Sequence, residues 1–112
     1  MAAINAERAR NARSRVAPWS CLDRFATSWS ANLARTGSFA HRSMAVVLRG
    51  CSATRAAENL ARGKVGPERV VAMWMASPGH RANLLDGRLT NVGVAATYAR
   101  GQWTVVANMG RP

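Results

Sequence analysis

Three side chains of this sequence could bind a metal ion or transfer a proton, and all three lie far apart along the chain. They are His41 in GSFAHRSM, Glu58 in AAENLARG and His80 in SPGHRANLL. Two neutral imidazoles and one carboxylate could hold a divalent ion such as zinc, with water at the open position. Without a metal, the same groups could form a hydrogen-bonded cluster that fixes one element to another. The sequence contains no GxSxG nucleophile elbow and no HExxH motif, so spacing alone leaves both interpretations open.

The composition favours one basic domain covering residues 1–112. The 112 residues are 48% hydrophobic, which is enough for a single modest core. Lys and Arg together number 16 against five Asp and Glu, for a net charge of +11, and all but one of the basic residues are arginine. Because arginine suits phosphate and carboxylate groups, we expect an anionic surface as partner and no specific nucleic acid. A solvated basic face without a dedicated partner is the alternative.

Neither a membrane span nor a signal peptide is expected in this chain. No apolar run approaches the ~20 residues of a membrane span, and the opening MAAINAERARNARSR has arginine where a signal peptide would be apolar. If the native protein is exported, its signal has been removed from this chain. Cys21 and Cys51 are the only cysteines and lack CxxC spacing, so they form either one disulfide or two reduced thiols rather than a metal site.

Hydrophobic periodicity predicts two helices in the first third of the chain. The alanine- and arginine-rich residues 3–14 predict the first. The clearest amphipathic helix runs through SCLDRFATSWSANLARTG, which Ser20 can cap and Gly37 can end. Its apolar residues, which are expected to pack in the core, are Leu22, Phe25, Ala26, Trp29 and Leu33.

The middle of the chain predicts three short helices and one ambiguous segment. SMAVVLRGC predicts a short helix that Gly50 stops, whereas RAAENLARG suits a strand or an extended loop. The Gly-Pro pair at residues 66–67 opens a helix that is expected to reach about Ala76. SPGHRANLL then restarts a short helix, with His80 in its first turn.

The C-terminal quarter predicts a β-hairpin. NVGVAATY and WTVVANM alternate so that their apolar residues share one face, and Arg100-Gly101 between them suits a tight turn. A hairpin of this kind needs helices to cover its apolar face. The fold class is therefore α+β.

Six segments follow one another along almost the whole chain: INAERA, GSFAH, AENLARG, VVAMWMASPGHRANLL, NVGVA and QWTVVANMG. Together, over about residues 4–110, they resemble the CAP superfamily (SCP/PR-1, or cysteine-rich secretory, antigen 5 and pathogenesis-related) in its short bacterial form. The resemblance implies an α-β-α sandwich with a small antiparallel sheet flanked by helices. It also implies a secreted or extracellular protein, which favours the disulfide between Cys21 and Cys51 over two thiols.

The resemblance further implies a surface cleft in which His41, Glu58 and His80 converge as candidate metal ligands. Many eukaryotic members have a second glutamate three residues beyond the tryptophan, where this chain has Ser77. The incomplete acidic set implies weak, exchangeable binding of a divalent metal such as zinc. Ala57 also stands where the family usually has glycine, a change that affects the local backbone more than the chemistry.

Two functions are compatible with this resemblance. The first, which we favour, is a secreted, non-enzymatic binding module that takes an envelope or lipid-like ligand. The alternative is a metal-dependent hydrolase that uses the His/Glu cleft, and turnover that depends on both His41 and His80 would identify it. The expected partner is lipid or an anionic cell-envelope component, with peripheral membrane contact, and the expected oligomeric state is a monomer.

Overall fold

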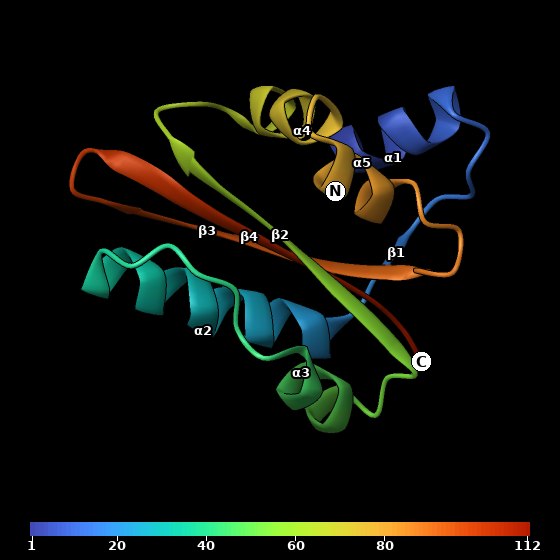
Figure 1. Ribbon diagram of the computed structural model, residues 1–112, viewed down its shortest axis with the longest axis horizontal. Helices are drawn as coiled ribbons and strands as arrows, with labels where there is room; N and C mark the ends of the chain where they lie inside the picture. Colours follow the sequence, from blue (N-terminus) through green and yellow to red (C-terminus); the bar gives the residue numbers. More distant parts are fainter.

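The computed structural model describes residues 1–112 as three layers, with a sheet between two layers of helices (Figure 1). The elements follow one another as α1 (Ala2–Arg10), β1 (Ala17–Pro18), α2 (Ser20–Thr36), α3 (Met44–Cys51), β2 (Arg55–Gly63), α4 (Pro67–Met75), α5 (Pro78–Leu84), β3 (Asn91–Ala99) and β4 (Gln102–Arg111). Helices α2 and α3 cover one face of the sheet, and α1, α4 and α5 cover the other. The predicted α+β class and α-β-α sandwich are confirmed. None of the helices is both long and apolar enough to cross a membrane.

The sheet has the order β1-β3-β4-β2. It includes RAAENLARG, the segment for which the sequence left strand and extended loop open. Strands β3 and β4 form the predicted antiparallel hairpin, whose turn residues Arg100 and Gly101 have φ values of 56° and 78°. RAAENLARG is a strand, β2, and pairs antiparallel with β4 along its whole length. Strand β1 pairs parallel with β3. It was not predicted, because two residues are too few to show a period.

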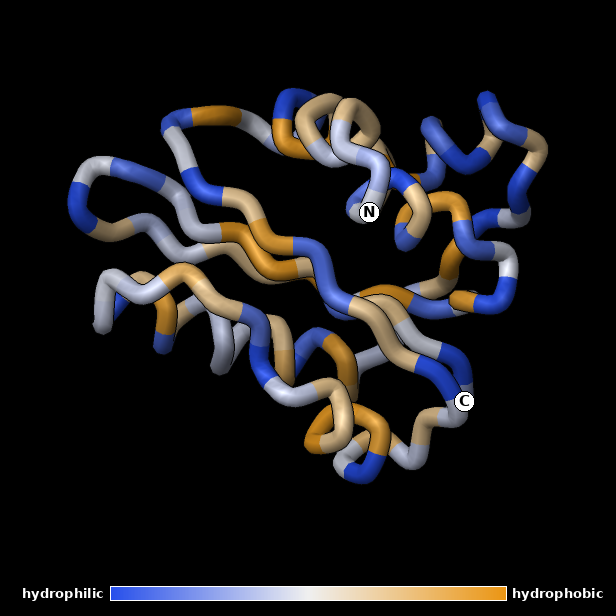
Figure 2. The backbone as a smooth tube through the Cα atoms, in the orientation of Figure 1, coloured by the Kyte–Doolittle hydropathy of each residue, from blue (hydrophilic) through white to orange (hydrophobic).

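The core is divided between the two faces of the sheet. Successive side chains of a strand point to opposite faces, so each strand contributes to both halves. On the α1/α4/α5 face, the Trp74 indole N–H donates to the Leu60 carbonyl at 2.8 Å and anchors α4 to β2. On the α2/α3 face, Leu33 and Val106 are fully buried. Figure 2 shows apolar stretches of the tube where the strands pass between the helices.

Two helix ends differ from the prediction. Helix α1 stops at Arg10 rather than near residue 14, because the backbone turns at Ala12 (φ 56°) and brings the Ser14 carbonyl back to Arg8 Nε at 2.6 Å. Helix α2 starts at Ser20, which makes no side-chain cap, and ends as predicted at Gly37 (φ 77°).

Gly50 lies inside α3 and does not stop it, contrary to the prediction. A Cβ atom at this position would overlap Cζ of Phe25, so glycine is required by close packing between α2 and α3. The same two helices are joined by a disulfide between Cys21, near the start of α2, and Cys51, at the end of α3. The disulfide that the resemblance favoured is confirmed.

Candidate functional site

Two of the three predicted site residues, His41 and Glu58, are in direct contact. His41 lies in the loop between α2 and α3, and its Nδ1 is 2.9 Å from Oε1 of Glu58 on β2. The His41 side chain is 59% exposed, whereas the Glu58 side chain is 2% exposed. The pair therefore consists of a buried carboxyl group with an imidazole between it and solvent.

Both carboxylate oxygens of Glu58 are engaged by the protein. The Arg42 backbone N–H donates to Oε1 at 3.3 Å. Asn108, opposite Glu58 on β4, donates its amide N–H to Oε2 at 3.0 Å and accepts from the Ala26 N–H at 3.2 Å in the amide orientation that satisfies both neighbours. Burial raises the pKa of Glu58 above its ordinary value, and the hydrogen bonds from His41 and Arg42 lower the pKa by less than burial raises it.

His80 lies in the first turn of α5, as predicted, but it reaches β2 from the other side. The His80 carbonyl accepts a hydrogen bond from Asn59 Nδ2 at 3.1 Å, and Asn83 Nδ2 donates to Asn59 Oδ1 at 3.0 Å. Because neighbouring strand residues point to opposite faces, Asn59 faces α5 while Glu58 faces the α2–α3 loop. The His41 side chain and the His80 backbone therefore meet β2 from opposite faces.

The structure joins His41 to Glu58, and the convergence of His80 with this pair stays a prediction. The structure contains no group of three or more His, Cys, Asp or Glu side chains placed to hold a metal ion. Three protein ligands are the usual minimum for a zinc site with an open position, and Glu58 already accepts hydrogen bonds at both oxygens. The arrangement of His41 and Glu58 fits the alternative of a hydrogen-bonded cluster, and zinc binding stays a prediction.

Two aromatic side chains of α2 that were expected in the core pack against its edge and also flank an arginine beside this cluster. The guanidinium carbon of Arg42 lies 4.8 Å from the Phe25 ring centroid and 5.3 Å from that of Trp29. Arg42 also donates to the Phe25 carbonyl at 3.1 Å, and both rings are half-buried. The stacked arginine fixes the residue next to His41 and so orients the α2–α3 loop.

A second candidate site, which the sequence did not reveal, is an apolar cavity of about 420 Å³ on the opposite face of the sheet. It is partly open and lies between α1, the start of α4 and the β3–β4 hairpin. Of its 13 lining residues 11 are hydrophobic and none has a charged side chain. They are Met1, Ala3, Ile4, Val65, Gly66, Pro67, Val70, Val71, Trp74, Val94, Ala96, Trp103 and Val105.

Part of this wall follows from alternation that the sequence did show. Val94 and Ala96 of β3 and Trp103 and Val105 of β4 lie on the face that the period-2 pattern predicted to be apolar. The rest of the wall comes from the β2–α4 loop, from α4 and from α1, whose one large buried apolar residue is Ile4. The cavity was missed because a gap between a helix and a hairpin has no signature in either segment alone.

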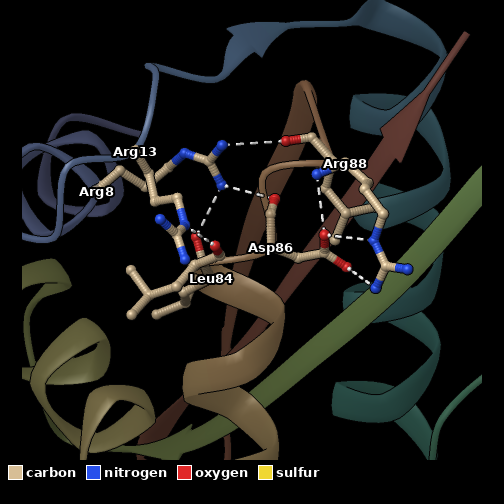
Figure 3. A network of polar contacts seen from close by, with 7 residues as sticks. Arg8, Arg13, Leu84, Asp86 and Arg88 are labelled. Carbon is tan, nitrogen blue, oxygen red and sulfur yellow. Dashed lines mark hydrogen bonds and ion pairs between the residues drawn. The ribbon is translucent and has the colours of Figure 1, made fainter.

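Helix α1 is held in place by polar contacts rather than by an apolar stripe (Figure 3). Arg8 is 1% exposed, and its guanidinium donates to the carbonyls of Leu84, Asp86 and Leu89 at 2.8, 3.2 and 3.3 Å. Burial is the main cause that lowers the pKa of Arg8 from its ordinary value. Arg8 thus attaches α1 to the end of α5 and to the loop before β3. The sequence pattern that could have indicated a buried Arg8 is INAER, in which Arg8 lies four residues after Ile4 and so on the same face of the helix.

Comparison with known proteins is consistent with this fold. The profile of the Cysteine-rich secretory protein family (CAP) matches residues 1–109. YkwD of Bacillus subtilis (strain 168) is 44% identical over 55 residues, which are 49% of this chain and 21% of that protein, so this chain spans only about a fifth of its relative.

Solved structures show the same fold at low sequence identity. An outer surface protein from Borrelia burgdorferi superposes with a TM-score of 0.88 at 19% identity, over 96% of this chain and 86% of that chain. An extracellular protein containing a SCP domain from Bacillus anthracis superposes with a TM-score of 0.83 at 24% identity, over 97% of this chain and 38% of that chain. Since the family profile covers nearly every residue, this chain belongs to the CAP, or cysteine-rich secretory protein, family.

Proposed function

We propose that this chain is an exported CAP-domain binding module that holds an apolar ligand, such as the acyl chain of an envelope lipid, in the cavity between α1, α4 and the hairpin. The observation that carries the proposal is the apolar lining of that cavity. Its volume of about 420 Å³ lies within the range of small-molecule sites, which are usually preformed and mostly apolar. Because no charged side chain lines it, a polar headgroup would stay at the opening.

Export is supported by two independent features. The disulfide between Cys21 and Cys51 is of a kind that persists in oxidising compartments. The two solved structures described above are of an outer surface protein and of an extracellular protein, and the family is that of cysteine-rich secretory proteins. We therefore place the ligand in the cell envelope or outside the cell.

Titration with a fluorescent fatty acid in vesicle-free solution tests the proposal. Ala96 is exposed on β3 and lines the cavity, so Ala96→Phe is expected to fill its opening without disturbing the core. We expect this variant to bind the probe about tenfold more weakly, which corresponds to about 1.4 kcal/mol. The matched control is Ala45→Phe, an equal enlargement at an exposed position of α3. Equal affinities of the two variants would contradict the proposal.

The metal-dependent hydrolase remains the alternative, and an ester-hydrolysis assay with and without zinc separates it from the binding module. It requires one ion held by both His41 and His80, whereas the structure joins only His41 to Glu58. We expect weak zinc binding at neutral pH, lost in a His41→Ala/His80→Ala double variant, and a melting temperature that chelation leaves nearly unchanged. Ester hydrolysis that needs zinc and both histidines would instead support the alternative.

A further inference from the structure

An exposed aromatic pair stands at the outer end of the β3–β4 hairpin. Tyr98 is 58% exposed and Trp103 is 40% exposed, and the two rings pack edge to face with centroids 5.2 Å apart. They lie directly opposite each other in the ladder, on the face that carries the apolar cavity. Tryptophan and tyrosine combine a large apolar surface with a polar group, which suits them to the boundary between lipid and water.

The same end of the molecule is basic. The hairpin turn, the loop between β2 and α4, and the C-terminus of α2 gather there (Figure 1). Arg100 Nη2 donates to the Arg35 carbonyl at 2.9 Å, and Cε of Lys64 lies 3.9 Å from the position of a Cβ on Gly101. In Figure 2 the hairpin turn is hydrophilic, and the β2–α4 loop is hydrophilic at its first bend and apolar directly after it.

Acidic residues are nearly absent from this end. Among the five acidic residues of the chain, Glu68 in the first turn of α4 is the one close by. The others lie in α1, near the start of α2, in the middle of β2 and after α5. The local charge is therefore complementary to an anionic surface.

This basic and aromatic end is continuous with the apolar cavity. Trp103 belongs to both, and so do Val65 and Gly66 of the β2–α4 loop, which follow Lys64. A bilayer in contact with Tyr98 and Trp103 would thus lie beside the cavity, with its headgroups against Lys64 and the hairpin turn. A soluble polyanion would contact the basic side chains but would not bury the Tyr98–Trp103 pair.

We propose that the hairpin turn, the β2–α4 loop and the Tyr98–Trp103 pair form a docking surface for an anionic phospholipid bilayer. The basic side chains contact the headgroups, and the two aromatic rings lie at the boundary between headgroups and acyl chains. This docking goes beyond the proposed ligand binding and does not require a ligand in the cavity.

Cosedimentation with vesicles of phosphatidylcholine and phosphatidylglycerol tests the surface. The native chain is expected to bind in about 0.1 M salt and to be released in about 0.5 M salt, because screening shortens the reach of the charges. Lys64→Gln/Tyr98→Ser is expected to weaken binding about tenfold, since it removes one nearby cation and one interfacial aromatic ring. Both residues are exposed, so the variant should fold, which circular dichroism checks.

The matched control is Arg24→Gln/Val46→Ser, which makes the same change in charge and also removes one exposed apolar side chain. Both positions are exposed, near the start of α2 and in α3, away from the hairpin turn. The control is expected to bind nearly as the native chain does. Equal binding of the two double variants would overturn the proposal, as would tighter binding of the native chain to soluble polyphosphate than to the anionic vesicles.

Vesicles with brominated acyl chains give an independent measurement. They are expected to quench the tryptophan emission of the native chain and to quench Trp103→Phe clearly less, because Trp103 is the tryptophan at the docking surface. Quenching of equal strength in both proteins would overturn the proposal. Anionic vesicle binding by a chain that takes no fatty acid in vesicle-free solution would contradict the proposed function and leave the docking surface intact.

Discussion

Glu58 is an ionisable residue that is both buried and hydrogen-bonded at its two carboxylate oxygens. Its carboxyl group is shielded by the sheet and by His41, and its two oxygens accept hydrogen bonds from two parts of the chain, the α2–α3 loop and β4. Burial of a charged carboxylate costs free energy that hydrogen bonds only partly offset, which is why the pKa of Glu58 rises. Glu58 thus joins the α2–α3 loop to the sheet, and its protonation should influence stability.

We expect the free energy of unfolding of the native chain, relative to Glu58→Gln, to fall as pH rises from the ordinary glutamate pKa of 4.5 through the raised folded value. A group whose pKa is raised on folding stabilises the fold below its unfolded pKa, and this contribution is lost as pH rises through the folded pKa. Each unit of elevation corresponds to about 1.4 kcal/mol. Urea unfolding of both proteins over a pH series measures the difference.

The control repeats the comparison in a His41→Gln background, which removes the imidazole that contacts Glu58 Oε1. If the native and Glu58→Gln proteins differ by a constant amount across the series, burial does not raise the pKa of Glu58 as described.

Among the elements, α1 depends most on a single side chain. Its docking to α5 and to the loop before β3 uses the Arg8 guanidinium, and Asn5 adds a reciprocal pair of hydrogen bonds with the Val16 backbone at 3.2 and 2.7 Å. The helix supplies Ile4 and Ala3 to the cavity wall. The position of α1, and with it the shape of the cavity, therefore rests on buried polar contacts.

Arg8→Met is expected to lower the free energy of unfolding by about 3 kcal/mol, because it leaves buried carbonyl groups without donors at a cost of about 1–3 kcal/mol each. The same variant should bind the fatty-acid probe more weakly, since α1 loses its fixed position. Urea unfolding measures the first effect and probe titration the second. Arg10→Met, at an exposed position of the same helix, is the control, and equal stability of the two variants would refute this role for Arg8.

The molecule as a whole has two helix layers that meet only through the sheet, and covalent cross-linking is confined to one of them. The disulfide joins α2 to α3, and its cysteines pack with Leu22 and Val47. The other layer has the arginine network instead. The net stability of a domain of this size is about 5–15 kcal/mol. Loss of either the disulfide or the Arg8 contacts would therefore remove a large part of the stability of the fold.

Cys21→Ala/Cys51→Ala is expected to reduce the free energy of unfolding by about 4 kcal/mol, since the bond restricts the unfolded chain across a sequence separation of 30 residues. Thermal and urea unfolding give the loss. The unreduced native protein should show no reactive thiol after denaturation, and reductant should lower its stability but not that of the double variant. Two titratable thiols in the unreduced protein would contradict the bond.

Local sequence was sufficient for most elements and for the family. The hairpin, α2, α4 and the first-turn position of His80 all follow from patterns within one segment, because hydrophobic period, proline and glycine act over a few residues. Gly50 shows the limit of such reasoning. Its role depends on the Phe25 ring of another helix, so a glycine that usually ends a helix lies inside one.

The candidate site depended on how the layers meet across β2. The sequence indicated His41, Glu58 and His80 as residues with suitable chemistry, and the resemblance implied that they converge. Which face of β2 each segment covers is a long-range outcome of sheet order and strand alternation, and it joins His41 to Glu58 while the His80 carbonyl meets Asn59. The apolar cavity has the same origin, because packing of α1 against a hairpin far along the chain creates a space that no single segment encodes.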